Sequence, residues 1–211
     1  FQKHPSYYYL NRYEASNNDE PHIYILLEKT PSNTCSLPAP GSEQYLHLDM
    51  LRNVGERSDA CIVRYYWASN YIKPGDRVLD AACGTGYGGH MLRHLSEASR
   101  VTGIDSSEIS ITYAKHLYGT HAERADYKYG ILPEVLSSYE DGSFDVIISF
   151  ETLTYIEDSK ALLNEFHRIL TPGGRVIISV PNGPHDVPHK DASLQPPQVY
   201  DWRRLKHELG S

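Results

Sequence analysis

The amino-acid sequence predicts an α/β fold of the doubly wound kind, in which helices cover both faces of a parallel sheet. Short apolar runs alternate with stretches of helical periodicity from residue 73 onward. Two of these runs, 146–148 and 176–178, are continuously apolar, as strands buried on both faces are. The first strand leads into a glycine-rich turn and then a helix. Alternating strands and helices imply parallel pairing through right-handed crossovers.

Residues 1–44 differ from the rest of the chain, because turn-forming residues surround a single apolar run at 23–27. Prolines at 31, 38 and 40 break any long element there. We therefore predict an N-terminal extension or cap over 1–44 and one folded domain over 45–211. A linker from a preceding domain is the alternative interpretation of residues 1–44.

Helical periodicity begins the folded domain at 43–72, where Cys61, Tyr65 and Ala68 share one face. Four further helices and five strands follow in alternation. We expect the strands at 77–81, 100–104, 126–129, 144–150 and 175–180, and the helices at 86–98, 107–118, 158–170 and 202–209. This succession predicts that the five strands pair in parallel.

The glycine-rich turn after the first strand indicates a ligand site. Asp80 lies near the end of that strand, and Gly84 and Gly86 follow. Glycine lets the backbone turn tightly and approach a ligand closely, and the N–H groups that begin a helix favour an acceptor group. A carboxylate at the carboxyl end of the strand, where open α/β sheets bind ligands, adds a partner for an ammonium group. We expect a nucleoside ligand that also carries an ammonium group.

Other interpretations stay open at this stage. Gly84, Gly86 and Gly89 also fit the G-x-G-x-x-G pattern of nicotinamide and flavin sites, and the turn could be purely structural. In dehydrogenases, however, the first glycine normally follows the strand directly, without an acidic residue four positions earlier. Asp105, which follows the second strand, suits the hydroxyls of a ribose in either kind of site. Its alternative role is to cap the next helix, beside Ser106 and Ser107.

Four stretches in the right order resemble the class I S-adenosylmethionine (SAM)-dependent methyltransferase family. They read NYIKPGD at 70–76, VLDAACGTGYG at 78–88, DGSFDVIIS at 141–149 and ILTPGGRV at 169–176. The resemblance implies a Rossmann-like fold whose five parallel strands lie in the spatial order 3-2-1-4-5, SAM as the cofactor and methyl transfer as the activity. Sheets of this family usually end in an antiparallel hairpin. Here the stretch after residue 180 is too short for a loop, a helix and two ordinary strands, so we expect that hairpin to be absent.

The resemblance also implies roles for individual residues. Asp80, Gly84 and Gly86 would hold the methionine end of SAM, and Asp105 would hold the ribose. Ile131 stands where relatives commonly carry an aspartate, so backbone groups would read the adenine edge instead. The full set of cofactor-binding residues that we predict is Asp80, Ala81, Gly84, Gly86, Asp105, Ser106, Ile131, Leu132, Phe150 and Arg64.

Phe150 and Arg64 would contact two further parts of SAM. Phe150, with Glu151 beside it, would lie beneath the sulfonium. Arg64 precedes the first strand, where a guanidinium can make a bidentate contact to the SAM carboxylate. Arg57 is a second candidate for that contact, and a solvated helix face is the alternative for both arginines.

Catalytic candidates lie in the polar loop after the fifth strand. Many relatives read E-x-L-E-H where this chain reads ETLTY at 151–155, so Tyr155 replaces a histidine. Tyrosine is a poor base at neutral pH. We therefore predict that His185 or His189 acts as the general base for a hydroxyl acceptor. A divalent-metal site and a plain polar loop are the alternatives; we predict no metal.

Composition limits the classes of partner and the compartment that we expect. The formal net charge of −7 disfavours nucleic acid. Three widely spaced cysteines indicate a reducing compartment, and no apolar run approaches the roughly 20 residues of a membrane span. We expect a cytoplasmic protein.

Composition and the residues near the C-terminal helix indicate the acceptor. The chain holds 17 tyrosines, concentrated in its N-terminal third. The stretch made of Pro181-Asn182, a polar loop, VYDW at 199–202 and a helix after it resembles methyltransferases of glycans or nucleotide-linked sugars. We predict methyl transfer to a hydroxyl of a sugar or glycan, by a homodimer or by a domain attached to a larger glycan-building protein. The alternatives are an O- or N-methyltransferase of a small aromatic, quinone or natural-product acceptor, and a non-catalytic SAM-binding module.

Overall fold

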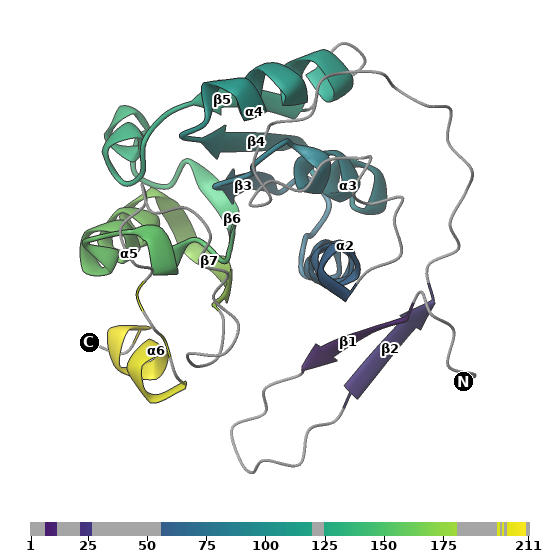
Figure 1. Ribbon diagram of the computed structural model, residues 1–211. Coiled ribbons are helices and arrows are strands. Elements are labelled where there is room, and N and C mark those ends of the chain that lie inside the picture. The colour runs from purple at the N-terminus through teal and green to yellow at the C-terminus, as the bar shows by residue number, and fades with distance from the viewer. Residues whose placement is uncertain are drawn as a thin grey trace.

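The computed structural model describes residues 7–11, 22–26, 56–119, 125–180, 198, 200 and 202–209. Its centre is a five-stranded parallel sheet (Figure 1). The strands are β3 Arg77–Ala81, β4 Arg100–Asp105, β5 Ala125–Tyr129, β6 Phe144–Phe150 and β7 Leu170–Ser179. Their spatial order is β5-β4-β3-β6-β7, which confirms the predicted doubly wound, Rossmann-like sheet of order 3-2-1-4-5.

Helices cover both faces of this sheet (Figure 1). The α-helices are α2 Glu56–Ser69, α3 Tyr87–Leu95, α4 Glu108–Ala114, α5 Ser159–Ile169 and α6 Trp202–Leu209, and the short helices are η1 Lys115–Gly119, η2 Glu134–Ser138 and η3 Leu153–Tyr155. Side chains of α2, α3 and α4 pack in one core, and side chains of α5, η2 and η3 pack in the other. The helix that follows the glycine-rich turn, α3, therefore lies on one face of the sheet, and α5 lies on the other.

Both cores are apolar because neighbouring residues of a strand point to opposite faces. In β3, Val78 enters the core under α2 and α3, whereas Leu79 enters the core under α5. In β6, Val146 and Ile147 divide in the same way. All four side chains are buried, which explains why these strands are continuously apolar in the sequence.

Strand β7 begins earlier than the sequence indicates. Phe144 pairs with Leu170, but Val146 pairs with Arg175, so the Pro-Gly-Gly turn at 172–174 is an irregularity within the strand. Gly173 there has a φ of 81°, a conformation that glycine adopts freely. The predicted turn at 172–174 is therefore wrong as a strand boundary: these residues form an irregularity inside β7, and the residues on both sides pair with β6.

The N-terminal part of the chain contributes a separate pair of strands. β1 (Tyr7–Asn11) and β2 (His22–Leu26) pair antiparallel with each other, and β1 contacts α2 (Figure 1). Within the described residues, no antiparallel strand joins the five-stranded sheet. None of the described helices combines the length and the apolar character needed to cross a membrane.

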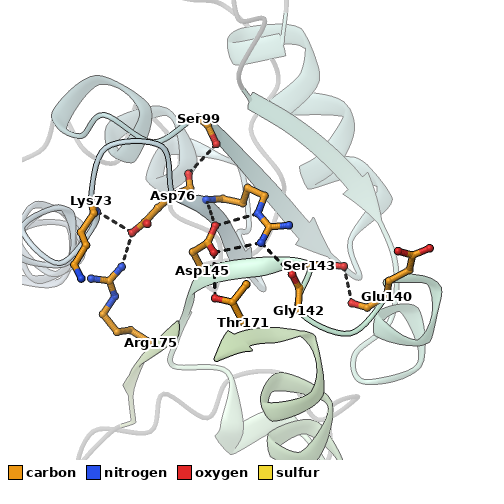
Figure 2. Close-up of polar contacts among 10 residues, drawn as sticks. Lys73, Asp76, Ser99, Glu140, Gly142, Ser143, Asp145, Thr171 and Arg175 are labelled. Atoms are coloured by element: carbon orange, nitrogen blue, oxygen red, sulfur yellow. Dashed lines mark hydrogen bonds and ion pairs between the residues drawn. The ribbon is translucent and has the colours of Figure 1, made fainter. Parts of the chain in front are cut away.

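A polar network ties together the amino ends of the strands (Figure 2). Asp145 of β6 accepts hydrogen bonds from the Arg77 backbone N–H at 2.8 Å, from Arg77 Nε at 3.0 Å and from Thr171 Oγ1 at 3.1 Å. These bonds, chiefly those from the Arg77 side chain, lower the pKa of the Asp145 carboxyl. Nearby, Asp76 pairs with Arg175 of β7. The network joins the β3, β6 and β7 ends of the sheet.

Candidate functional site

The loop between β3 and α3 is folded tightly. Ala82, Gly84 and Gly86 all have positive φ, at 66°, 54° and 82°. A Cβ on Gly86 would stand 2.6 Å from the Ala114 Cβ and 2.8 Å from the Tyr127 ring. Gly86 therefore combines a left-handed backbone, which glycine adopts without steric cost, with a close approach to α4 and β5 that leaves no room for a Cβ. The loop brings the start of α3 to the carboxyl edge of the sheet.

Asp80 is the buried acid of this edge. Its side chain is 0% exposed, and the Tyr65 hydroxyl donates to its two carboxylate oxygens at 3.0 and 3.3 Å. Among the described residues this hydroxyl is its one hydrogen-bond donor, whereas an ionised carboxylate can accept about four hydrogen bonds. Burial raises the pKa of Asp80 to about 7, Asp105 adds to the rise and the Tyr65 bond opposes it. Asp80 therefore keeps acceptor capacity for a donor that the described residues do not supply.

Asp105 lies at the end of the neighbouring strand, β4. It is 7% exposed, and its Oδ2 accepts the Gly84 N–H while its Oδ1 accepts the Ser107 N–H, both at 2.8 Å. Burial raises its pKa, and these two hydrogen bonds oppose the rise. The N-cap of α4 is Ser107, whose side chain accepts the Ser110 N–H. The simple capping role considered for Asp105 is therefore wrong; it ties the glycine loop to the turn where exposed Ser106 lies.

The carboxyl end of β6 adds an aromatic ring and an ion pair. The half-buried Phe150 ring lies edge-on to the Tyr65 ring, with centroids 5.0 Å apart. Glu151 has a φ of 58°, which is uncommon for a residue other than glycine. Ser179 Oγ donates to Glu151 Oε1 at 2.8 Å, and Arg64 Nη1 lies 3.0 Å from the same oxygen. Arg64, predicted to contact SAM, is thus paired with Glu151 in this structure.

The remaining predicted cofactor residues lie at the same edge. Gly130, after β5, donates its N–H to the Asp105 carbonyl at 3.0 Å, which places Ile131 and Leu132 beside the end of β4. Ile131 is 56% exposed, whereas Leu132 packs against the core under α5. Ala81 is buried in that core.

The structure thus brings the predicted residues of β3, β4 and β6 together at one edge, with Arg64 from α2 reaching the same place. His185 and His189 lie outside the described residues, so their catalytic role stays a prediction. In the part of the chain that the structure describes, no group of three or more His, Cys, Asp or Glu side chains is arranged to hold a metal ion.

Sequence reasoning missed two contacts of the site. Tyr65 is predicted only as one member of an apolar helix face, and its hydroxyl bond to Asp80 is not expected from that pattern. Glu151 is noted only for its position beneath the sulfonium, not as the partner of Arg64. Both contacts join residues far apart in the sequence, so no local pattern indicates them. The available signal was a hydroxyl or charged group, on Tyr65 and Arg64, at or beside the apolar face of a predicted helix.

Comparison with known proteins assigns the family. A family model described as a methyltransferase domain matches residues 72–209. The chain belongs to this methyltransferase-domain family. The matched stretch contains β3 to α6, so it includes both buried acids and the glycine loop between them.

Individual relatives agree with the family. The probable S-adenosylmethionine-dependent methyltransferase of Mycolicibacterium smegmatis is 33% identical over 122 residues, covering 58% of this chain and 44% of the relative. The ubiquinone biosynthesis O-methyltransferase of Idiomarina loihiensis is 33% identical over 109 residues, covering 51% and 43%. The chain therefore spans less than half the length of these two relatives.

A solved structure supports the fold assignment. Phosphoethanolamine N-methyltransferase 2 of Haemonchus contortus, in complex with S-adenosyl-L-methionine, superimposes with a TM-score of 0.60 at 20% identity, covering 72% of this chain and 36% of that one. The family model confirms the methyltransferase part of the predicted resemblance, and this solved structure supports the fold. These relatives include both an O- and an N-methyltransferase, and none of the three names a glycan acceptor.

SAM is the cofactor of the methyltransferase family to which the chain belongs, and the residues of this site suit it. SAM carries an ammonium group, a ribose and a sulfonium. The spare acceptor capacity of buried Asp80 suits an ammonium, because a buried carboxylate is stabilised by a cation that bonds to it. Asp105 lies one strand away, across the glycine loop, where a ribose would meet it.

Proposed function

We propose that this methyltransferase domain binds SAM across the carboxyl ends of β3, β4 and β6 and transfers the methyl group to a hydroxyl of a small polar acceptor. The observation that carries the proposal is the pair of buried carboxylates, Asp80 and Asp105, on neighbouring strands around the Gly84–Gly86 loop. The Asp105 carboxylate disfavours the ionised form of buried Asp80. A cationic ligand with hydroxyl groups relieves that repulsion.

Each part of the site has a proposed role. Asp80 accepts hydrogen bonds from the ammonium group of the methionine moiety, and Asp105 accepts them from the ribose hydroxyls while it keeps its two backbone donors. The glycine loop lets the backbone approach the ligand. Exposed Ile131 packs on the adenine ring, and backbone groups of Ile131 and Leu132 read the adenine edge.

When bound, SAM supplies a methyl group activated by the positive charge of its sulfonium. The chain then has to hold the acceptor oxygen in line with that methyl group and exclude water. Phe150 provides an apolar surface beneath the transferring group. Arg64, Glu151 and Ser179 form a polar border beside Phe150, which suits an acceptor with several hydrogen-bonding groups.

A hydroxyl acceptor must lose its proton as it attacks. We propose that His185 or His189 takes this proton, because an imidazole is half-ionised near neutral pH and Tyr155 is a weak base. Replacing the responsible histidine by alanine should lower kcat by about 10²–10⁴-fold and leave SAM affinity unchanged. Near-normal rates in both single variants would assign the proton transfer to another group.

A sugar or glycan hydroxyl is our preferred acceptor, because the tyrosine-rich composition and the polar border suit a ligand with many hydroxyl groups. A quinone-type phenol is the second candidate, because the relative from Idiomarina loihiensis is a ubiquinone biosynthesis O-methyltransferase. The cytoplasmic location, homodimer formation and attachment to a larger glycan-building protein belong to this proposal as well.

The test is transfer of labelled methyl groups from SAM to matched panels of sugars, phenols and ethanolamine-type amines. At a SAM concentration below Kd, we expect labelled sugar with the wild-type protein, the same rate with Asp145→Asn at the opposite end of the sheet, and a rate about 100-fold lower with Asp80→Asn. Transfer to phenols or amines alone would replace the proposed acceptor. SAM binding without transfer to any panel would contradict the proposed activity and leave a binding module.

A further inference from the structure

Tyr65 connects four parts of the site. It comes from α2, and its hydroxyl bonds to Asp80 of β3. Its ring lies edge-on to Tyr87 of α3, with centroids 5.4 Å apart, and to Phe150 of β6. A Cβ on Gly88 would stand 2.0 Å from this ring, so the glycine makes room for it. The ring is therefore fixed by packing, and its hydroxyl has a fixed direction.

The groups around Asp80 differ in their effect on its charge. Those that interact with it from the packed elements are Tyr65, Cys83, Tyr87, Asp105 and Tyr127. Burial raises the pKa of the three tyrosines and of the cysteine, so these four groups stay neutral near pH 7. The Asp105 carboxylate opposes ionisation of Asp80, and the hydrogen bond from Tyr65 favours it.

We infer that Tyr65 is a positioning residue of the cofactor site, whose hydroxyl holds the Asp80 carboxylate ionised and oriented toward the ammonium group of SAM. This inference rests on the SAM site proposed above and adds a residue that does not itself contact the cofactor. A single phenol proton leaves most of the acceptor capacity of the carboxylate free for the ligand. The fixed ring keeps that free capacity directed at the same place.

Loss of the Tyr65 hydroxyl should weaken SAM binding in a pH-dependent way, which loss of packing alone would not do. Without the hydroxyl, the pKa of Asp80 rises further, and a smaller fraction of the protein holds the ionised form that binds an ammonium. The loss of affinity must therefore be larger at low pH, where that fraction is small, and smaller at high pH. A residue that only fills space would weaken binding by the same factor at every pH.

The test is calorimetric measurement of SAM affinity for the wild-type protein and Tyr65→Phe at pH 6 and pH 7.5. Tyr139→Phe is the matched control, because the buried Tyr139 hydroxyl has no hydrogen-bond partner among the described residues. If the missing hydrogen bond moves the pKa of Asp80 by one unit, Kd should rise about tenfold at pH 6 and about threefold at pH 7.5. The control should bind as the wild type does, and thermal unfolding of each variant verifies that it is folded.

A second comparison uses Asp80→Asn as the background. There the Tyr65→Phe change should have no further effect on SAM affinity, because the carboxylate it acts on is gone. Equal affinity of Tyr65→Phe and wild type, or a loss of affinity that is the same at both pH values, would overturn the inference. Failure of methyl transfer in the wild type, with the pH-dependent loss intact, would overturn the proposed activity alone.

Discussion

The two ends of one sheet hold their carboxylates in opposite ways. At the amino end, Asp145 accepts hydrogen bonds from the backbone and side chain of Arg77 and from Thr171 (Figure 2), and its pKa is lowered. At the carboxyl end, Asp80 accepts hydrogen bonds from Tyr65, and burial raises its pKa to about 7. The amino end satisfies Asp145 within the described residues, whereas at the carboxyl end the described residues leave acceptor capacity on Asp80, which we propose the SAM ammonium fills.

Backbone conformation follows the same division. Glycine occupies the positive-φ positions at the amino end, Gly75, Gly142 and Gly173. At the carboxyl end, Ala82 and Glu151 also adopt positive φ, which costs on the order of 1–3 kcal/mol for each such residue. Both the buried charge and the backbone strain are thus concentrated where ligands bind in open α/β sheets.

The largest expected effect comes from Asp80→Asn, which removes the acid and keeps its shape. SAM affinity should fall by about 100-fold, since hydrogen bonds to charged groups contribute about 1.5–3 kcal/mol. The same change should stabilise the ligand-free protein at pH 8, by up to about 4 kcal/mol if the full pKa rise is relieved. Calorimetry and urea unfolding measure the two effects.

The sign of the Asp80 effect on stability depends on pH. Because the folded pKa of Asp80 is raised, its contribution to stability is present at low pH and is lost as pH rises through about 7. The advantage of Asp80→Asn should therefore shrink between pH 8 and pH 5. If Asp80→Asn were less stable than the wild type at pH 8, Asp80 would stabilise the fold in its ionised form as Asp145 does, and the contrast between these two acids would be contradicted.

Asp105→Ala should weaken SAM binding by about 1.5–3 kcal/mol, the range for hydrogen bonds to a charged group. It should also lower the free energy of unfolding, because the Gly84 and Ser107 N–H groups lose their acceptor. Asp105 therefore resembles Asp145 in accepting hydrogen bonds within the protein, and it resembles Asp80 in its proposed contact with SAM. Unchanged SAM affinity by calorimetry would remove the ribose role and leave a structural one.

Asp145→Asn should have the smallest effect, and unlike Asp80→Asn it should lower stability without changing SAM affinity. We expect a loss of about 1 kcal/mol in the free energy of unfolding, because exposure to solvent screens the Arg77 pair, and no change in SAM affinity. Since the pKa of Asp145 is lowered, its contribution exists above the pKa of the unfolded state and disappears as pH falls through the folded value. Urea unfolding at pH 7 and pH 3 tests this; a loss that is equal at both would contradict it.

Much of the fold follows from local patterns in the sequence. The continuously apolar β6 and the alternation of strands with helices predict a buried parallel sheet, because burial on both faces leaves a direct trace in composition. The order of its strands came from the resemblance to the methyltransferase family. Asp80, the glycine loop and Asp105 were found for a similar reason: their spacing reflects one strand–turn–helix unit and the end of the next strand.

The contacts that complete the site depend on tertiary packing. Tyr65 bonds to Asp80 because α2 crosses the start of α3 at Gly88, and Glu151 meets Arg64 because β6 ends beside α2. A helical periodicity identifies Tyr65 as a buried residue and carries no information on where its hydroxyl points. The start of β7 was misplaced for the same reason, since the pairing of Leu170 with Phe144 is not encoded locally.

The pH dependence of SAM binding to the wild-type protein tests most directly the claim that the carboxyl end holds an acid for a cation. Calorimetry in buffers of different ionisation enthalpy measures both the affinity and the protons exchanged on binding. We expect the affinity to fall by about tenfold per pH unit well below the pKa of Asp80, with nearly one proton released per SAM bound at pH 6. An affinity that is constant from pH 5.5 to pH 8, with no proton released, would contradict the account.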